Sequence, residues 1–245
     1  MRADTPAEPM RISNLTVIRG KTQAFSDLSF CVEAGEIFGL VGLNGAGKTS
    51  LIKAALSLLE AEKGEVRFFG VSHLQPESRQ KVSYLPEHLA PQGQMRGVEF
   101  LRFALGLHGL ALDRPEADRI AAAIDLDCRK LDQRISSYSK GMGQKLGLLA
   151  TLLSDCPLLL LDEPMNGLDP RARILLKTQM QAYRARGHSI FLSSHILTDL
   201  DELCDRIAVL HGGRLLFTGT PESLRELHGE ATLERAFLAA IAGDI

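Results

Sequence analysis

One stretch constrains the fold of this 245-residue chain more than any other: Gly42–Thr49, which reads GLNGAGKT. It fits the phosphate-loop pattern G-x-x-x-x-G-K-[ST]. An expected strand over residues 36–41 precedes it, and apolar residues at helical spacing over 50–59 follow it. In this order, loop N–H groups and the positive N-terminus of the helix surround an anion. The stretch therefore predicts binding of a nucleoside triphosphate and leaves open what the nucleotide drives.

The residue types of the loop suit this interpretation. The Lys48 ammonium would reach the β- and γ-phosphates, and the Thr49 hydroxyl would ligate Mg²⁺. The alternative is a glycine-rich turn without a ligand. The residues expected around the phosphates are Gly42, Asn44, Gly45, Ala46, Gly47, Lys48, Thr49 and Ser50.

Composition narrows the class of partner. The formal net charge is -2, which offers no basic surface for the phosphates of a nucleic acid. No apolar run reaches the roughly 18 to 20 residues that a membrane-spanning helix needs. The start, MRADTPAEPM, lacks the apolar core of a secretory signal. The four cysteines form no C-x-x-C pair, which favours buried thiols in a reducing compartment. We expect a cytoplasmic protein that binds no nucleic acid.

The order of expected elements predicts an α/β fold. Strands dominate the first third, a helical texture runs from about 98 to 153, and strands and helices then alternate to about 210. This alternation is typical of a mostly parallel sheet interrupted by one helical lobe. We expect a flexible extension over residues 1–9, a nucleotide-binding domain over 10–220 with a helical subdomain inserted at about 90–156, and a helical tail over 221–245.

A pair of acids ends a continuous apolar run, LLLLDE. Asp162 and Glu163 thus follow an expected buried strand, at the sheet edge where α/β proteins bind ligands. Asp162 would hold Mg²⁺, and Glu163 would take a proton from an attacking water. The alternative is a strand that simply ends in polar residues. With the phosphate loop, the pair indicates hydrolysis.

Three further short motifs complete a recognisable order: YSKGM at 138–142, NGLD at 166–169 and SSH at 193–195. Over about residues 11 to 220 the chain resembles the ATP-binding-cassette (ABC) ATPases. In that family a phosphate loop, a signature, an acid pair, a D-loop and a switch histidine follow one another. The resemblance implies a P-loop NTPase core with an inserted α-helical subdomain, ATP and Mg²⁺ as cofactors, and a head-to-tail homodimer or a pair of cassettes.

The resemblance also implies roles for single residues. Ser139 and Gly141 of one copy would contact the γ-phosphate on the other copy, and Asp169 would cross the interface. His195 would contact the γ-phosphate within its own site. Without the family, YSKGM is an N-capped helix start, NGLD a turn and His195 a structural histidine. YSKGM departs from the commoner LSGGQ, since Lys140 and Met142 replace glycine and glutamine.

Two positions depart from the family pattern near the nucleotide. Glu87, in Y-L-P-E, stands where many cassettes have glutamine, and it would accept from an Mg²⁺-bound water while adding negative charge. Arg19 or Ile18 stands where an aromatic residue usually stacks on adenine. The Arg19 guanidinium could stack on a base, or it could be an ordinary surface arginine.

The Y-L-P-E form and the ending L-E-R-A-F-L at 233–238 resemble cassettes of the ABC-2-type exporter branch. The resemblance implies an ATPase subunit that energises an exporter through separate membrane subunits, which would dock near Glu87–Phe103. It also implies a place on the cytoplasmic face of the plasma membrane. The alternative is a soluble or slowly hydrolysing regulatory cassette that is not dedicated to transport.

Overall fold

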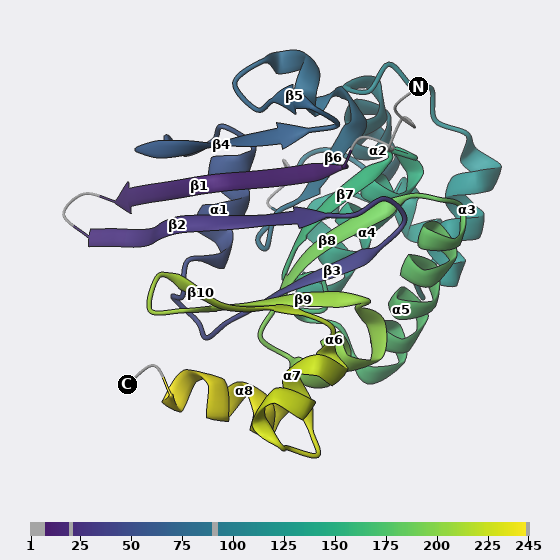
Figure 1. Ribbon diagram of the computed structural model, residues 1–245. Coiled ribbons are helices and arrows are strands. Elements are labelled where there is room, and N and C mark those ends of the chain that lie inside the picture. Colours follow the sequence, from purple (N-terminus) through teal and green to yellow (C-terminus); the bar gives the residue numbers. More distant parts are fainter. Residues whose placement is uncertain (1–7, 20–21, 90–92, 244–245) are drawn as a thin grey trace, which may run out of the picture.

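The computed structural model describes residues 8–19, 22–89 and 93–243, without the side chains of Arg19, Thr22 and Gln23. The described residues form two sheets, which lie one above the other in Figure 1. Sheet A has the order β2-β1-β4-β5, with β1 (Met10–Arg19), β2 (Thr22–Val32), β4 (Lys63–Phe68) and β5 (Val71–Ser72). Sheet B has the order β10-β9-β3-β8-β7-β6, with β3 (Ile37–Val41), β6 (Val82–Leu85), β7 (Leu158–Asp162), β8 (Ser189–Ser194), β9 (Arg206–His211) and β10 (Arg214–Gly219).

Sheet B is parallel except at one edge. Strands β9, β3, β8, β7 and β6 all run in the same direction, so their carboxyl ends meet at one edge. Only β10 is antiparallel, joined to β9 through Gly212 and Gly213. Both glycines have positive φ, 54° and 76°, as the tight turn between two twisted strands requires.

The central strands are apolar on both faces because both faces are covered. Along β7, Leu158 and Leu160 pack into a core shared with α1 and sheet A, whereas Leu159 and Leu161 pack against helices on the other side. In β8, Phe191 enters the first core and Ile190 and Leu192 the second. This double burial explains why these strands read as unbroken apolar runs.

Helices form the remaining layers (Figure 1). The helix α1 contacts both β1 and β7 and so lies between the sheets. Among the described residues, no helix combines the length and the hydropathy that a membrane-spanning segment needs. The α-helices are α1 (Lys48–Ala55), α2 (Gly97–Gly106), α3 (Arg114–Ala123), α4 (Lys140–Leu153), α5 (Pro170–Ala185), α6 (Leu197–Leu203), α7 (Pro221–His228) and α8 (Leu233–Ala242), and the short 3₁₀ helices are η1 (Pro76–Lys81), η2 (Cys128–Asp132) and η3 (Ile135–Ser137).

The α/β expectation and the order of elements agree with the structure, but two details differ. The early strands build their own antiparallel sheet, because both β2 and β4 pair antiparallel with β1. The expected helix over 50–59 is too long, since α1 ends at Ala55. Ser57 has φ +58°, which a right-handed helix cannot accommodate, and Leu58 is 64% exposed.

Each expected helical region also consists of several shorter helices, which the sequence pattern does not separate. The stretch from 98 to 153 contains α2, α3 and α4 with η2 and η3 between them. The tail forms α7 and α8, separated at Gly229, which has φ +65° and caps α7. The expected extension 1–9 and the lobe boundary at 90 fall largely on residues outside the described ranges.

The first prediction concerns the core between the sheets. Phe191 is 1% exposed, and its ring stacks on Phe30 and Phe38 with centroid distances of 6.1 and 5.9 Å. Phe191→Ala should lower the free energy of unfolding by about 3–5 kcal/mol, because it leaves a cavity between two packed sheets. The control Leu74→Ala, at a side chain 73% exposed, should change it by less than about 0.5 kcal/mol. Urea titrations with equal losses for both variants would contradict this picture of the core.

Candidate functional site

The phosphate loop leaves β3 at the centre of sheet B and enters α1. Gly42 turns so close to β9 that a Cβ atom there would lie 2.6 Å from the Leu210 carbonyl oxygen. Gly47 has φ +103° at the N-cap of α1, a conformation that favours glycine. The close approach at Gly42 and the positive φ at Gly47 explain why the pattern has glycine at both positions. The loop and the N-terminus of α1 border the same cavity, and the N–H groups of a helix N-terminus suit an anion.

The loop borders a cavity of about 350 Å³. Three segments far away in sequence complete its wall through Glu87, Glu163 and His195, all three of which the sequence predicts as site residues. Asn166 also lines the cavity. The remaining lining residues are Leu43, Asn44, Gly45, Ala46, Gly47, Lys48, Thr49 and Ser50. The structure thus brings most of the predicted residues together.

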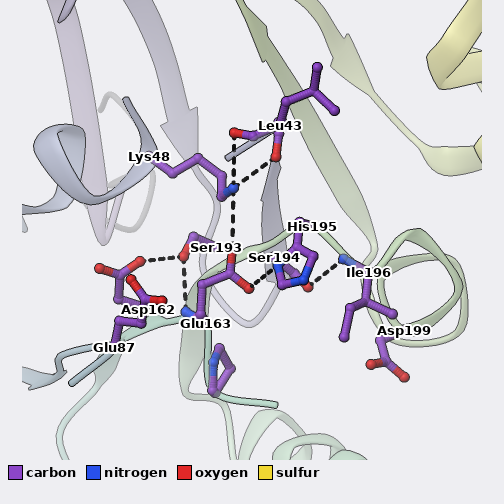
Figure 2. Close-up of polar contacts among 12 residues, drawn as sticks. Leu43, Lys48, Glu87, Asp162, Glu163, Ser193, Ser194, His195, Ile196 and Asp199 are labelled. Atoms are coloured by element: carbon purple, nitrogen blue, oxygen red, sulfur yellow. Dashed lines mark hydrogen bonds and ion pairs between the residues drawn. The ribbon is translucent and has the colours of Figure 1, made fainter. Parts of the chain in front are cut away.

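The Lys48 side chain points toward Glu163 (Figure 2). Its Nζ donates to the carbonyl oxygens of Gly42 at 2.7 Å and Leu43 at 3.4 Å, and it lies 3.2 Å from Oε1 of Glu163. The side chains of Lys48 and Glu163 are each 7% exposed. A charge buried to this degree needs compensation, so each side chain holds the other in place.

His195 holds Glu163 from a second side. His195 Nδ1 lies 2.9 Å from Glu163 Oε2. An ionised carboxylate only accepts hydrogen bonds, so Nδ1 is the donor and Nε2 is the nitrogen left for other partners. Glu163 has φ +50°, a left-handed conformation that is uncommon for a non-glycine residue. Its N–H donates to the Ser193 hydroxyl at 3.0 Å and to the Ser193 carbonyl oxygen at 3.2 Å.

Asp162 differs from its neighbour in having an unsatisfied oxygen. The side chain is fully buried, and Oδ1 accepts a hydrogen bond from the Ser193 hydroxyl at 2.6 Å. Oδ2 accepts none from the described residues. Burial raises the pKa of nearby Tyr84 to about 12, and the charges of Asp162 and Glu87 add to this effect. The carboxylates of Asp162 and Glu87 make this part of the site negative, which suits a cation.

The donor set fits Mg²⁺. Within the described ranges, no cluster of three or more His, Cys, Asp and Glu side chains forms a metal centre by itself. Asp162 Oδ2, the Glu87 carboxylate and the Thr49 hydroxyl are oxygen donors, and Mg²⁺ usually keeps waters and phosphate oxygens as its other ligands. The residues present therefore match a cation that enters together with a triphosphate.

Comparison with known proteins identifies the family. A family model described as ABC transporter matches residues 25–166, which is more than half of the chain and includes the phosphate loop and the acid pair. The chain belongs to the ABC transporter family. The resemblance seen in the motifs is thereby confirmed.

Two relatives carry the names of ATP-binding proteins of ABC transport or export systems. An uncharacterised ABC transporter ATP-binding protein of Synechocystis sp. is 37% identical over 213 residues, 85% of this chain and 59% of the relative. Nod factor export ATP-binding protein I of Rhizobium meliloti is 34% identical over 225 residues, 89% of this chain and 66% of the relative. The chain therefore spans less than two thirds of the length of either relative.

Solved structures confirm the fold class. One described as the ATP-binding subunit of an ABC transporter has a TM-score of 0.88 at 31% identity and covers 94% of this chain and 98% of its own. A nucleotide-free ATP-binding cassette from an ABC transporter, at 18% identity, has a TM-score of 0.77 with the same coverage and supports the fold alone.

Five described residues among those predicted for the site do not line the cavity: Gly42, Ser139, Gly141, Asp162 and Asp169. Ser139 is the exposed N-cap of α4 and accepts from the Met142 N–H at 3.2 Å. Asp169 caps α5, and the hydrogen bond from the Ala172 N–H, 2.9 Å long, lowers its pKa. A Cβ atom on Gly141 would lie 2.9 Å from the Gly167 carbonyl oxygen, so the two helix starts are packed together. The Arg19 side chain lies outside the described part of the chain.

The structure also adds residues that the sequence analysis did not assign to the site. Ser193 binds Asp162 through its hydroxyl and Glu163 through its hydroxyl and its carbonyl oxygen, whereas the SSH motif predicts a role only for His195. Asn166 lines the cavity, although only Asp169 of its motif was assigned. Ser193 is adjacent to Asp162 because β7 and β8 pair in parallel register. The pairing of β7 with β8 is therefore the signal that identifies Ser193 as a site residue, and no short motif contains it.

A second prediction tests Ser193. Ser193→Ala removes the donor to buried Asp162 and one of the acceptors of the Glu163 N–H, so it should lower the free energy of unfolding by about 1–3 kcal/mol. Ser137→Ala, which removes an exposed hydroxyl bonded to the Arg134 carbonyl oxygen, is the matched control and should have almost no effect. Denaturant titration measures both. Equal stability of the two variants would show that the Ser193 bridge contributes nothing.

Proposed function

We propose that this cassette binds ATP with Mg²⁺, hydrolyses it, and energises transport by separate membrane subunits. The observation that carries the proposal is the position of Glu163. It is a buried carboxylate beside the phosphate loop, held by Lys48 on one oxygen and His195 on the other. No other described carboxylate lines the cavity except Glu87.

Phosphate binding falls to the loop and Lys48. The Lys48 ammonium has three hydrogens to donate, and two of its present partners are neutral carbonyl oxygens. A triphosphate at the α1 N-terminus would draw Lys48 from Glu163, because a multiply charged anion attracts an ammonium more strongly than one carboxylate. Glu163 would then be free to accept a proton from water. His195 would keep it oriented through Nδ1 and present Nε2 toward the γ-phosphate.

Metal binding would fall to oxygen donors in the wall of the same cavity and directly behind it. Thr49, Asp162 and Glu87 supply the oxygen donors, and Ser193 fixes the orientation of Asp162. When bound, Mg²⁺ would neutralise charge that develops on the phosphates. Glu87 adds a carboxylate where many cassettes carry a neutral amide, so this chain holds its metal in a more negative environment.

We infer that the active form is a head-to-tail homodimer. Ser139, Gly141 and Asp169 do not line the cavity of their own chain, yet they lie close together at the start of α4 and in the turn before α5. The helix α4 has 14 residues, and its N-cap Ser139 and first residue Lys140 are exposed, so its N-terminus suits an anion brought by a second copy. The loop of one copy and this surface of the other would form a complete site.

The membrane partner would dock at an apolar hollow next to the site. A cavity of about 240 Å³ is lined by residues of β6, α2 and α4, among them Tyr84, whose pKa burial and the charges of Asp162 and Glu87 raise. Leu107, which lines this cavity, is 73% exposed, and Phe103 of α2 is 58% exposed. This hollow supports docking near Glu87–Phe103, of which residues 90–92 lie outside the described ranges. The export relatives favour an exporter, with the cassette held at the cytoplasmic face of the plasma membrane.

Glu163→Gln tests the catalytic role. Glutamine keeps the shape of the side chain and cannot take a proton, so turnover should fall by about 10²–10⁴-fold while ATP binding persists. In the presence of ATP, this variant should accumulate as a dimer, which light scattering detects. The control Glu226→Gln alters an exposed carboxylate on α7 and should hydrolyse ATP like the unaltered chain. Undiminished steady-state hydrolysis by Glu163→Gln would refute the assignment of the base.

Leu107→Glu tests the docking surface. A charge at the rim of the apolar hollow should abolish copurification of a membrane protein with several spanning segments, as identified by mass spectrometry of gently solubilised membranes. Leu227→Glu, at a side chain 66% exposed on α7, is the matched control and should retain the partner. Equal recovery of the partner with both variants would move the docking surface elsewhere. Thermal unfolding of both variants checks that they fold.

A further inference from the structure

A second group of charged side chains, outside the nucleotide cavity, connects α5 with α6. Its centre is Asp199 in the first turn of α6, with a side chain only 9% exposed. Figure 2 shows Asp199 on the segment that follows His195 and Ile196. Lys177 of α5 donates from Nζ to Asp199 Oδ1 at 3.1 Å and also pairs with Glu202. None of these residues lines the cavity, so the phosphate site does not account for them.

The other oxygen of Asp199 depends on a different cation. Oδ2 is buried and accepts no hydrogen bond from the described residues. Arg173 Nη1 lies 3.8 Å from it, and the Arg173 side chain is 33% exposed. A buried carboxylate oxygen without a donor is costly, so the nearby guanidinium supplies its compensating charge.

Arg173 makes a second contact in the opposite direction. Its Nε donates to the Leu168 carbonyl oxygen at 3.3 Å. Leu168 belongs to the turn that follows Glu163 directly, and in this turn the Asn166 N–H donates to the Glu163 carbonyl oxygen at 3.0 Å. A guanidinium can make both contacts because it is planar and directs its donors outward in a fixed fork.

These contacts form a closed circuit. Glu163 leads through the chain to Leu168, Arg173 joins Leu168 to Asp199, and Asp199 leads back through the chain to His195. The 2.9 Å contact between His195 and Glu163 closes it. Both ends of that contact are thus attached to segments that one side chain holds together. We propose that Arg173 is a positioning residue, which fixes the distance between Glu163 and His195 by linking the turn after the acid pair to the helix after the histidine.

This inference rests on the proposed hydrolytic function but makes a separate claim. If Glu163 takes the proton and His195 orients it, their separation governs the rate of the chemical step and has little influence on ATP binding. A displacement of about 1 Å at such a distance can lower a rate by about 10²-fold. Loss of Arg173 should therefore reduce kcat and leave KM for ATP nearly unchanged.

The test compares three variants. Arg173→Met keeps the aliphatic length and removes both contacts, and it should lower kcat by about tenfold or more. Arg173→Lys keeps the charge near Asp199 without the fork, and its kcat should lie between those of Arg173→Met and the unaltered chain. Lys177→Met is the matched control. It removes a cation from the same carboxylate but no contact to the turn, so it should lower the unfolding temperature and leave kcat within about twofold.

A readout without turnover keeps the claim distinct from the proposed function. The ¹⁵N signals of the His195 ring, assigned by their absence in His195→Gln, report the hydrogen bond at Nδ1. They should shift in Arg173→Met and stay in place in Lys177→Met. Unchanged His195 signals and unchanged kcat in Arg173→Met would overturn the proposal, as would equal losses of kcat in Arg173→Met and Lys177→Met. If the unaltered chain hydrolyses no ATP while the His195 signals still shift, the hydrolytic function fails and the link stands.

Discussion

The site depends on the contacts that the buried Glu163 carboxylate makes with Lys48 and His195. Lys48 comes from the loop after β3, Glu163 from the end of β7 and His195 from the end of β8. These segments meet because β3, β8 and β7 are consecutive, parallel neighbours in sheet B. Parallel strands place their carboxyl ends at one edge, so three distant segments deliver a cation, an acid and a histidine to one cavity.

The layered core keeps that edge in place. Alternate residues of β7 and β8 pack against α1 and sheet A on one side and against the helices on the other. The strands therefore have little freedom to slide, since a shift of one residue would exchange the two cores. Ser193 adds a polar restraint where the packing ends, because it binds both acids of the pair. Packing thus fixes the strands, and hydrogen bonds fix the side chains at their ends.

Much of this was predictable, for reasons visible in particular residues. Unbroken runs such as Leu158–Leu161 predict doubly buried strands, and the glycines around Lys48 predict a phosphate loop. Prediction failed where a long-range contact or a single dihedral angle decides. The end of α1 follows from the left-handed Ser57, and sheet A from the pairing of β1 with β4. Leu58 and Leu59 fit the helical period, yet the helix ends before them.

By itself the sequence determined the chemistry of this protein: a loop that suits phosphates, two acids after a buried strand, and the order of motifs that marks the family. Those features are local, because they depend on residue types at short spacing. Only the tertiary structure decided which side chains meet. It joined Glu163 to Lys48 and His195, placed Ser193 between the two acids, and set Arg173 between Leu168 and Asp199. Such contacts depend on strand order and helix packing, which short-range patterns do not contain.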